Sequence, residues 1–281
     1  MYLKARVLEN RFIGHPSQKI YRLVLNGQLA LEAKPGQFVH LRVAESYDPL
    51  LRRPISIAVI DREKEKVVLY YRVTGRGTEA LTRIRENDYI SVLGPLGTGF
   101  TIPQTGGILL IAGGIGVFPL FALLDAIDRT KVQVKMFWGG EHRLFLESAD
   151  LNYLQKTGAD YELATMDGSA GYKGLVTDLL QAYLQEHASG HSFDSKSNSG
   201  TNPLRVAACG PKGMLQTVVN ICRQYNIPVE VSLEERMACG VGACLGCVCT
   251  VREGNGVLKR KRVCKEGPIF SGEEVVWDDQ V

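Results

Sequence analysis

The spacing of the cysteines constrains this chain more than any other feature of its sequence. Of the seven cysteines, four follow the pattern Cys239-x4-Cys244-x2-Cys247, with Cys264 further on. This is the plant-type spacing of the four thiolate ligands of a [2Fe–2S] cluster. We therefore predict that Cys239, Cys244, Cys247 and Cys264 bind such a cluster within a loop of the chain.

The residues between these cysteines suit a loop that wraps a cluster. Gly240, Gly242 and Gly246 allow positive φ and a close approach of the backbone. Backbone N–H groups in such a loop can point at the anionic sulfurs and influence their reduction potential. We expect a hairpin, formed by residues 248–252 and 257–263, to lead back to the fourth ligand.

Two other uses of the cysteines compete with this interpretation. A structural zinc site favours paired Cys-x2-Cys motifs, and only one such pair occurs here. Disulfides are rare in the reducing compartment that we expect for this chain. Cys249 can in principle replace Cys247 as a ligand, but its position favours a small buried hydrophobe in the following strand.

The overall composition narrows the compartment and the class of partner. The formal charge of +3 is too small to indicate nucleic acid or a membrane surface as a partner. The N-terminus carries Lys4, Arg6 and Glu9 and so lacks an apolar signal region. No apolar run reaches the roughly 18 residues that a membrane span requires. We expect a cytoplasmic protein without nucleic-acid or membrane partners.

The first part of the chain has the pattern of an antiparallel β-barrel. Apolar and polar residues alternate at 20–25, 37–43 and 67–71, with turn residues between these segments. A short helix near 79–86 precedes a further strand at 89–93. Closely spaced strands with one helix favour a small barrel over residues 1–102.

After Pro103 the pattern changes to alternating strands and helices. Strands are predicted at 108–112, 132–138, 161–165, 204–208 and 229–233, with amphipathic helices between them. One of these helices has a single apolar stripe that includes Leu120 and Ile127. The alternation predicts a parallel sheet covered by helices over residues 103–234. We expect residues 235–281 to form the cluster subdomain and the Ser- and Asn-rich stretch 188–203 to be a surface loop.

The barrel region carries residues suited to a flavin nucleotide. Arg53 can bind a pyrophosphate and Ser56 can hydrogen-bond the flavin ring. Aromatic faces and a helix N-terminus for phosphate follow further along the chain. Ordinary strand packing is the competing explanation for the tyrosines. The predicted FAD residues are Arg53, Pro54, Ile55, Ser56, Tyr70, Tyr71, Arg72, Gly77 and Thr78.

A glycine-rich turn indicates a second nucleotide site. Gly113, Gly114 and Gly116 follow a buried strand and open a helix, where N–H groups can bind a pyrophosphate. Pro119 stands where a third glycine would complete the dinucleotide motif, so a plain tight turn is the alternative. Glu141, after the next strand, disfavours a 2′-phosphate and therefore favours NAD over NADP.

Several motifs occur together in one order along the chain. They are LLRRPISI, YRVTGRGT, LGPLGTGF, GGIGVFPL, CGPKGML and EERMACGVGACLGCVC. In this the chain resembles the ferredoxin–NADP reductase superfamily and, within it, the electron-transfer subunits of class 1B dihydroorotate dehydrogenase. The superfamily usually has Tyr at the position of Ile55. The resemblance implies that Cys209 lies near the nicotinamide and the flavin, while a small core residue is the alternative.

The resemblance also implies a function. Hydride would pass from NADH to FAD, and single electrons would pass through the cluster to the FMN of a catalytic dihydroorotate dehydrogenase subunit. That relay serves pyrimidine biosynthesis in a heterotetramer of two plus two subunits, and it requires no acid–base residue. The basic run 259–262 either docks this partner or is a solvated hairpin face. Two competing functions are a subunit serving another acceptor, of the sulfide dehydrogenase or transhydrogenase type, and a zinc-binding interaction module.

Overall fold

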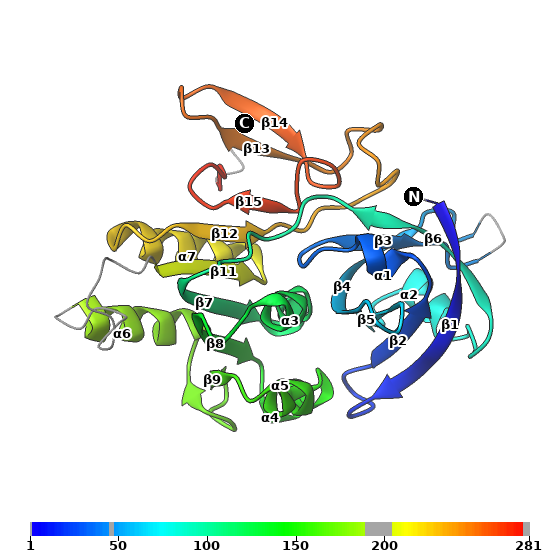
Figure 1. The fold of residues 1–281 in the computed structure, drawn as a ribbon, viewed down its shortest axis with the longest axis horizontal. Helices are drawn as coiled ribbons and strands as arrows, with labels where there is room; N and C mark the ends of the chain where they lie inside the picture. The colour runs from blue at the N-terminus through cyan, green and yellow to red at the C-terminus, as the bar shows by residue number, and fades with distance from the viewer. Residues whose placement is uncertain (1, 45–47, 189–203, 278–281) are drawn as a thin grey trace.

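A computed structural model describes residues 2–44, 48–188 and 204–277. Figure 1 shows a barrel, an open sheet with helices, and a small C-terminal hairpin that lies over the sheet, with its adjoining loops extending toward the barrel. The predicted loop at 188–203 lies, from residue 189 on, outside the described residues. Within the described residues, no helix is long and apolar enough to cross a membrane.

The N-terminal strands close into a barrel, as the alternating sequence pattern predicts. The strand order is β1 (Tyr2–Ile13), β2 (Ile20–Asn26), β5 (Lys66–Arg72), β4 (Arg53–Asp61), β3 (Phe38–Leu41) and β6 (Tyr89–Leu96). All of the paired neighbours run antiparallel. Inward-facing side chains such as Leu23, Leu41 and Leu69 are fully buried and form a separate core.

Two short helices accompany the barrel. These are α1 (Leu29–Glu32) and α2 (Arg76–Leu81). The sequence placed a helix at 79–86, so the prediction was right in kind but wrong in its limits. The Thr78 hydroxyl accepts hydrogen bonds from the N–H groups of Thr74 (3.0 Å) and Gly75 (3.3 Å), so the helix begins before Glu79.

The central sheet has the parallel order expected from alternating strands and helices. Its strands are β10 (Tyr172–Lys173), β9 (Asp160–Thr165), β8 (Val132–Gly140), β7 (Gly106–Gly113), β11 (Leu204–Cys209), β12 (Val229–Ser232) and β15 (Ile269–Ser271). All neighbours are parallel except β12 and β15. The helices are α3 (Val117–Ala126), α4 (Arg143–Ser148), α5 (Leu151–Thr157), α6 (Val176–Ala188) and α7 (Lys212–Gln224).

Helix α3 differs from its sequence expectation. The pattern predicted one buried stripe, but every residue from Val117 to Leu124 is buried. The reason is its position, because α3 lies between the sheet and the barrel and contacts β4 as well as β7 and β11 (Figure 1). Ile127 is the C-cap residue of the helix and is buried in the same core as Leu120.

The C-terminal segment joins the other two parts. Its hairpin, β13 (Val248–Arg252) and β14 (Leu258–Arg262), forms as predicted. The later strand β15 pairs with β12 and so adds an antiparallel edge to the central sheet. On the barrel side, the N–H of Thr98 donates to the carbonyl oxygen of Gly267 at 2.6 Å. The predicted cluster segment is therefore attached to both the sheet and the barrel.

Candidate functional site

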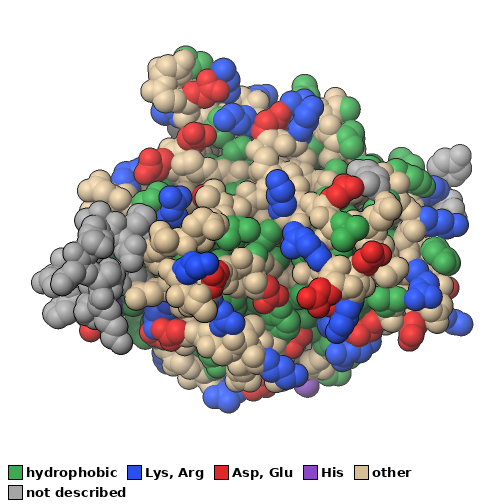
Figure 2. Space-filling model, in the orientation of Figure 1, with side chains coloured by type: hydrophobic (Ala, Val, Ile, Leu, Met, Phe, Trp, Pro, Cys, Tyr) green, Lys and Arg blue, Asp and Glu red, His purple; other side chains and the backbone are tan. Residues whose placement is uncertain are grey.

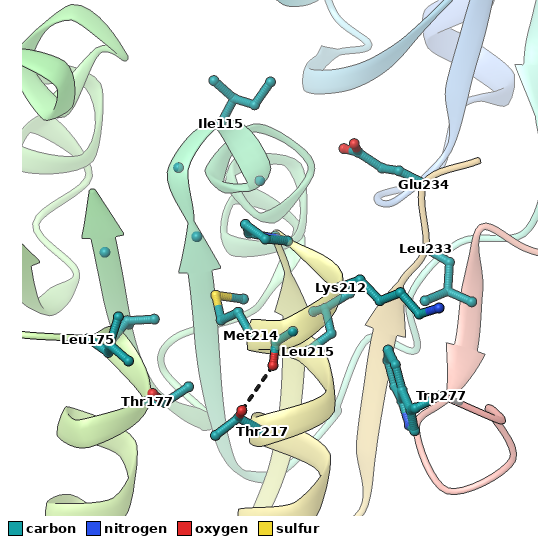
Figure 3. Close-up of a pocket in the computed structure, with 18 of the residues that line it drawn as sticks. Ile115, Leu175, Thr177, Lys212, Met214, Leu215, Thr217, Leu233, Glu234 and Trp277 are labelled. Carbon is teal, nitrogen blue, oxygen red and sulfur yellow. Dashed lines mark hydrogen bonds between the residues drawn. The ribbon is translucent and has the colours of Figure 1, made fainter. Parts of the chain in front are cut away.

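A large pocket of about 890 Å³ opens at the carboxyl ends of the central strands. Its walls come from the turns after β7 (Gly113–Gly116) and β8 (Gly139–Glu141), and from the start of α7. The cluster hairpin closes it through Val248–Thr250 and Arg260. Figure 3 shows the start of α7 between the two halves of the pocket. This edge of an open α/β sheet is where such sheets bind nucleotides.

The glycines at this edge allow two turns to pack backbone against backbone. A Cβ on Gly116 would lie 2.3 Å from the Cys209 carbonyl oxygen, and one on Gly113 would lie 2.4 Å from Met214 Sδ. Gly114 adopts a positive φ of 57°, which favours glycine. The structure thus brings Gly113, Gly114, Gly116 and Cys209 to one edge of the sheet.

Cys209 is buried beneath this pocket. Burial, together with the charge of Glu234, raises the pKa of its thiol. The group therefore remains a neutral thiol at physiological pH and is no nucleophile. Two interpretations of Cys209 therefore remain open: it is a small core residue, or it lies next to a bound nicotinamide or flavin ring.

Sequence reasoning missed Glu234 as a residue of the site. It follows β12, lines the pocket, and points in Figure 3 toward the space beside Ile115. Burial raises the pKa of its carboxyl group. Its position directly after a parallel strand was the available signal. Trp277, near the C-terminus, also lines the pocket, and nothing in the sequence indicated this.

The predicted flavin residues of β4 and α2 come together at the barrel. The Arg53 side chain lies directly against Gly77, where an added Cβ would be 1.9 Å from Arg53 Nε. Arg53 Nη1 donates to the Leu51 carbonyl oxygen at 2.6 Å. Ile55 and Ser56 are half-buried, whereas Pro54 is exposed. The guanidinium and the first turn of α2 therefore form one polar corner suited to a phosphate.

The two tyrosines of β5 use their side chains for packing. Tyr70 stacks on Phe118, with centroids 4.4 Å apart, and its hydroxyl donates to Asp150 Oδ2 at 2.7 Å. Tyr71 points into the barrel, where its hydroxyl donates to Asn10 Oδ1 at 3.0 Å. Burial raises the pKa of both hydroxyls. The structure thus shows strand packing for both rings, and the predicted contact of Tyr70 and Tyr71 with FAD stays a prediction.

Arg72 ends the same strand and reaches a different environment. It lines the large pocket, and its guanidinium lies 5.8 Å from the centre of the Phe145 ring. Its Nη2 also donates to Gln18 Oε1 at 3.4 Å. This is the one predicted flavin residue that belongs to the wall between the barrel and the nucleotide pocket.

The four cluster cysteines meet two by two. The N–H of Cys244 donates to Cys239 Sγ, and the N–H of Cys264 donates to Cys247 Sγ, each at 3.4 Å. The thiols within each of these pairs also contact each other. No three His, Cys, Asp or Glu side chains are grouped around a single ion position in the described part of the chain. The pairing fits an iron pair in which each iron takes two thiolates.

The cluster loop favours thiolate at its first cysteine. Burial would raise the pKa of Cys239, but N–H groups of Val241, Cys244 and Ala243 lower it to about 6. Burial and the neighbouring Cys247 thiol raise the pKa of Cys264 to about 12. A ring of N–H donors around a thiolate is the donor set that an anionic iron–sulfur cluster requires. The residues present therefore fit the cluster.

The loop conformation matches the glycine pattern in part. Gly240 and Gly242 have φ values of 72° and 80°, as expected. The third left-handed residue is Leu245, with a φ of 57°, and not Gly246. Gly246 instead donates its N–H to Cys244 Sγ at 3.4 Å. Cys249 lies outside both thiol pairs, and burial raises the pKa of its thiol to about 11.

The basic run 259–262 lies largely in ion pairs. Lys259 pairs with Glu253 (2.7 Å), Lys261 with Glu274 (3.6 Å), and Arg262 with Glu266. Figure 2 shows basic and acidic side chains intermixed over this hairpin at the top of the molecule. A solvated hairpin face describes these three residues, whereas Arg260 lines the large pocket.

Comparisons with known proteins identify the family. The model of the iron–sulfur cluster binding domain of dihydroorotate dehydrogenase B matches residues 234–276, and an oxidoreductase NAD-binding domain matches residues 110–220. The electron transfer subunit of dihydroorotate dehydrogenase B (NAD(+)) from Desulforamulus reducens is 39% identical over 89% of both chains. That from Geobacillus thermodenitrificans is 41% identical over 96% of both chains. The chain belongs to this family.

Family membership confirms the resemblance inferred from the motifs. A solved structure of an NADH-dependent reduced ferredoxin–NADP oxidoreductase is also similar, with a TM-score of 0.78 and 28% identity. The similarity covers 98% of this chain and 90% of that one. The predicted fold class, a flavin-type barrel followed by an α/β domain and a cluster subdomain, is therefore confirmed. The family models and the named relatives combine NAD and iron–sulfur chemistry, and the similar solved structure is described as a flavin-based electron-bifurcating protein.

Proposed function

We propose that this chain passes electrons between NAD(H) and the FMN of a catalytic dihydroorotate dehydrogenase subunit, through bound FAD and a [2Fe–2S] cluster. One observation carries the proposal. The hairpin that connects two of the cluster cysteines also forms a wall of the nucleotide pocket, through Val248, Cys249 and Arg260. Arg72, one of the predicted flavin residues, lines the same pocket, which supports a site shared by the three parts.

The proposal assigns binding roles to residues of each part. Arg53, with Gly77 and Thr78, would hold the flavin pyrophosphate, and the main chain of β4 and β5 would line the flavin ring. Gly113, Gly114 and Gly116 would hold the pyrophosphate of NAD. When bound, FAD supplies the step between two-electron and one-electron chemistry. The chain binds and orients the groups and keeps water away, without an acid–base residue.

The nucleotide preference follows from Glu141. This residue lines the pocket at the end of β8. A carboxylate there repels a 2′-phosphate and can accept hydrogen bonds from ribose hydroxyls. We propose NAD as the nucleotide. Glu141→Gln is expected to narrow the preference for NADH over NADPH, measured as the ratio of the two dissociation constants.

The names of the relatives support a proposal for the partner. The relatives are named electron transfer subunits of an NAD(+)-linked dehydrogenase, so we propose that electrons flow from the catalytic subunit to NAD⁺ in pyrimidine biosynthesis. The motif resemblance implied the opposite order, from NADH through FAD and the cluster to the FMN. The same cofactors can carry electrons in either direction. We further propose a cytoplasmic heterotetramer of two plus two subunits and three domains with boundaries at 102/103 and 234/235.

Reconstitution tests this function directly. The chain is produced with a catalytic dihydroorotate dehydrogenase subunit, and the complex is assayed for orotate formation with NAD⁺. We expect flavin and iron–sulfur absorption bands and NAD⁺-dependent turnover that neither subunit supports alone. A colourless preparation containing zinc would refute the proposal.

A related acceptor is the second candidate. The similarity to the NADH-dependent ferredoxin–NADP oxidoreductase covers almost the whole chain, which favours a partner of the transhydrogenase type over one of the sulfide dehydrogenase type. The two candidates are separated by the partner that co-purifies with the chain from its own cells. A flavin and iron–sulfur chain that couples to ferredoxin and not to dihydroorotate would favour the second.

A further inference from the structure

A histidine buried between the flavin strand and the cluster loop has no role in the function described so far. His40 lies on β3, and its side chain is 0% exposed. Within the described residues, neither of its ring nitrogens has a hydrogen-bond partner. Buried polar groups are almost always paired, so each exception requires an explanation. Leucine or phenylalanine would fill such a site without leaving an unpaired N–H.

His40 contacts the cluster loop on one side. A Cβ added to Gly240 would lie 2.6 Å from His40 Nδ1, 2.9 Å from Cε1 and 3.1 Å from Cγ. The imidazole therefore occupies the space beside Gly240 that a side chain would need, with Nδ1 nearest to the position of the added Cβ. Gly240 follows the ligand Cys239 and is itself buried, with a φ of 72°. An alanine there would both clash with the ring and strain the backbone.

On its other side His40 adjoins the flavin strand. It is the direct register partner of Pro54 on β4, one residue from Arg53 and two from Ser56. The Arg52 guanidinium donates to the His40 carbonyl oxygen at 3.2 Å. Figure 1 shows β3 on the side of the barrel that faces the segment between β12 and β13. The imidazole thus lies between strand β4, which carries predicted flavin residues, and the cluster loop at Gly240.

The imidazole is neutral in this position. Burial, and then the charges of Arg52 and Arg53, lower the pKa of His40 to about 4. A neutral imidazole keeps one N–H donor and one acceptor nitrogen. In a dry environment the dipole of an N–H group next to an anionic centre is little screened and acts strongly on it.

We propose that His40 is a positioning residue for electron transfer between the flavin and the cluster. It holds the Gly240 turn of the cluster loop against the flavin strand, and its N–H at Nδ1 favours the reduced, more negative cluster. This rests on the proposed function, because it requires both cofactors.

Three variants separate the donor from the shape of the ring. His40→Phe keeps an aromatic ring without a donor. His40→Asn and His40→Leu have nearly the same size, and only Asn carries an N–H donor, close to the position of Nδ1. Each holoprotein is examined for FAD and iron content, for the cluster midpoint potential by EPR-monitored redox titration, and for stepwise reduction by NADH in stopped flow.

The donor predicts a specific order of potentials. We expect a more negative cluster potential in His40→Phe and His40→Leu, with His40→Asn closer to the wild type. Loss of one hydrogen-bond equivalent corresponds to about a fivefold change in the electron distribution between flavin and cluster. Flavin reduction by NADH should keep its rate, whereas the later cluster reduction should slow in the variants without a donor.

Two results would overturn this role. One is a potential in His40→Phe and His40→Leu equal to that of the wild type. The other is loss of the cluster from all three variants alike, because the shape of the ring and not its N–H would then support the loop. A wild-type chain without a [2Fe–2S] signal would instead refute the proposed function, so the two failures are distinct.

Discussion

Gly116 offers a steric test of the contact on which the nucleotide pocket is built. Its φ of −61° and ψ of −7° are open to any residue, so alanine fits the backbone without strain. A Cβ there would lie 2.3 Å from the Cys209 carbonyl oxygen, 2.5 Å from its carbonyl carbon and 2.8 Å from the Gly210 nitrogen. These are backbone atoms, so the turn after β11 must move as a unit.

The size of the effect follows from this overlap. Overpacking of a tight contact destabilises a protein by about 1–3 kcal/mol. In a protein of this size, about 1 kcal/mol lowers the thermal midpoint by roughly 2–4 °C. Gly116→Ala should therefore melt several degrees lower than the wild type. Displacement of the N–H groups around Gly113 and Gly114 should also weaken NADH binding by about tenfold, equivalent to one hydrogen bond to a charged group.

Gly213→Ala is the matched control for stability. Gly213 lies in the first turn of α7, and no atom is within 4 Å of its added Cβ. Alanine at this helical position should stabilise the chain by up to about 1 kcal/mol. Differential scanning calorimetry of the FAD-loaded variants measures both effects, and flavin fluorescence titration measures NADH binding. Equal midpoints for the two variants would refute the steric reasoning.

Three further changes test other parts of the junction. Cys244→Ser should leave FAD bound and ferricyanide reduction by NADH measurable, while abolishing transfer to the partner; undiminished partner turnover would contradict the cluster relay. Tyr70→Phe removes the hydrogen bond to Asp150 that joins barrel and sheet, and should cost about 1 kcal/mol in thermal stability, so an unchanged midpoint would show that the ring stacking alone holds the interface. His40 has a folded-state pKa of about 4 against 6.5 when unfolded, so the unfolded state binds more protons between these values and stability is lost as the pH falls from about 6.5 to 4. Urea unfolding of wild type and His40→Phe over this range should show a shallower loss in the variant, and parallel curves would count against the buried neutral imidazole.

Local patterns in the sequence determined the type of each part. The cysteine spacing predicts which four thiols bind the cluster, because most of the plant-type ligand pattern lies within one short loop. The apolar run at 108–112 was enough to predict a doubly buried strand. The alternation expected at 67–71 did not predict burial, because every residue from Val67 to Tyr71 is buried. The glycine turn after β7 was found because its conformation and close packing restrict the residue type locally.

The tertiary structure alone decided which face each side chain uses and which distant segments meet. Tyr70 and Tyr71 are neighbouring residues of the same type. Tyr70 packs on Phe118 of the α/β part, whereas Tyr71 packs inside the barrel. His40 became a candidate only when β3 and the cluster loop were seen to meet. Burial and partners depend on contacts between residues far apart in the chain, and no local period in the sequence records those contacts.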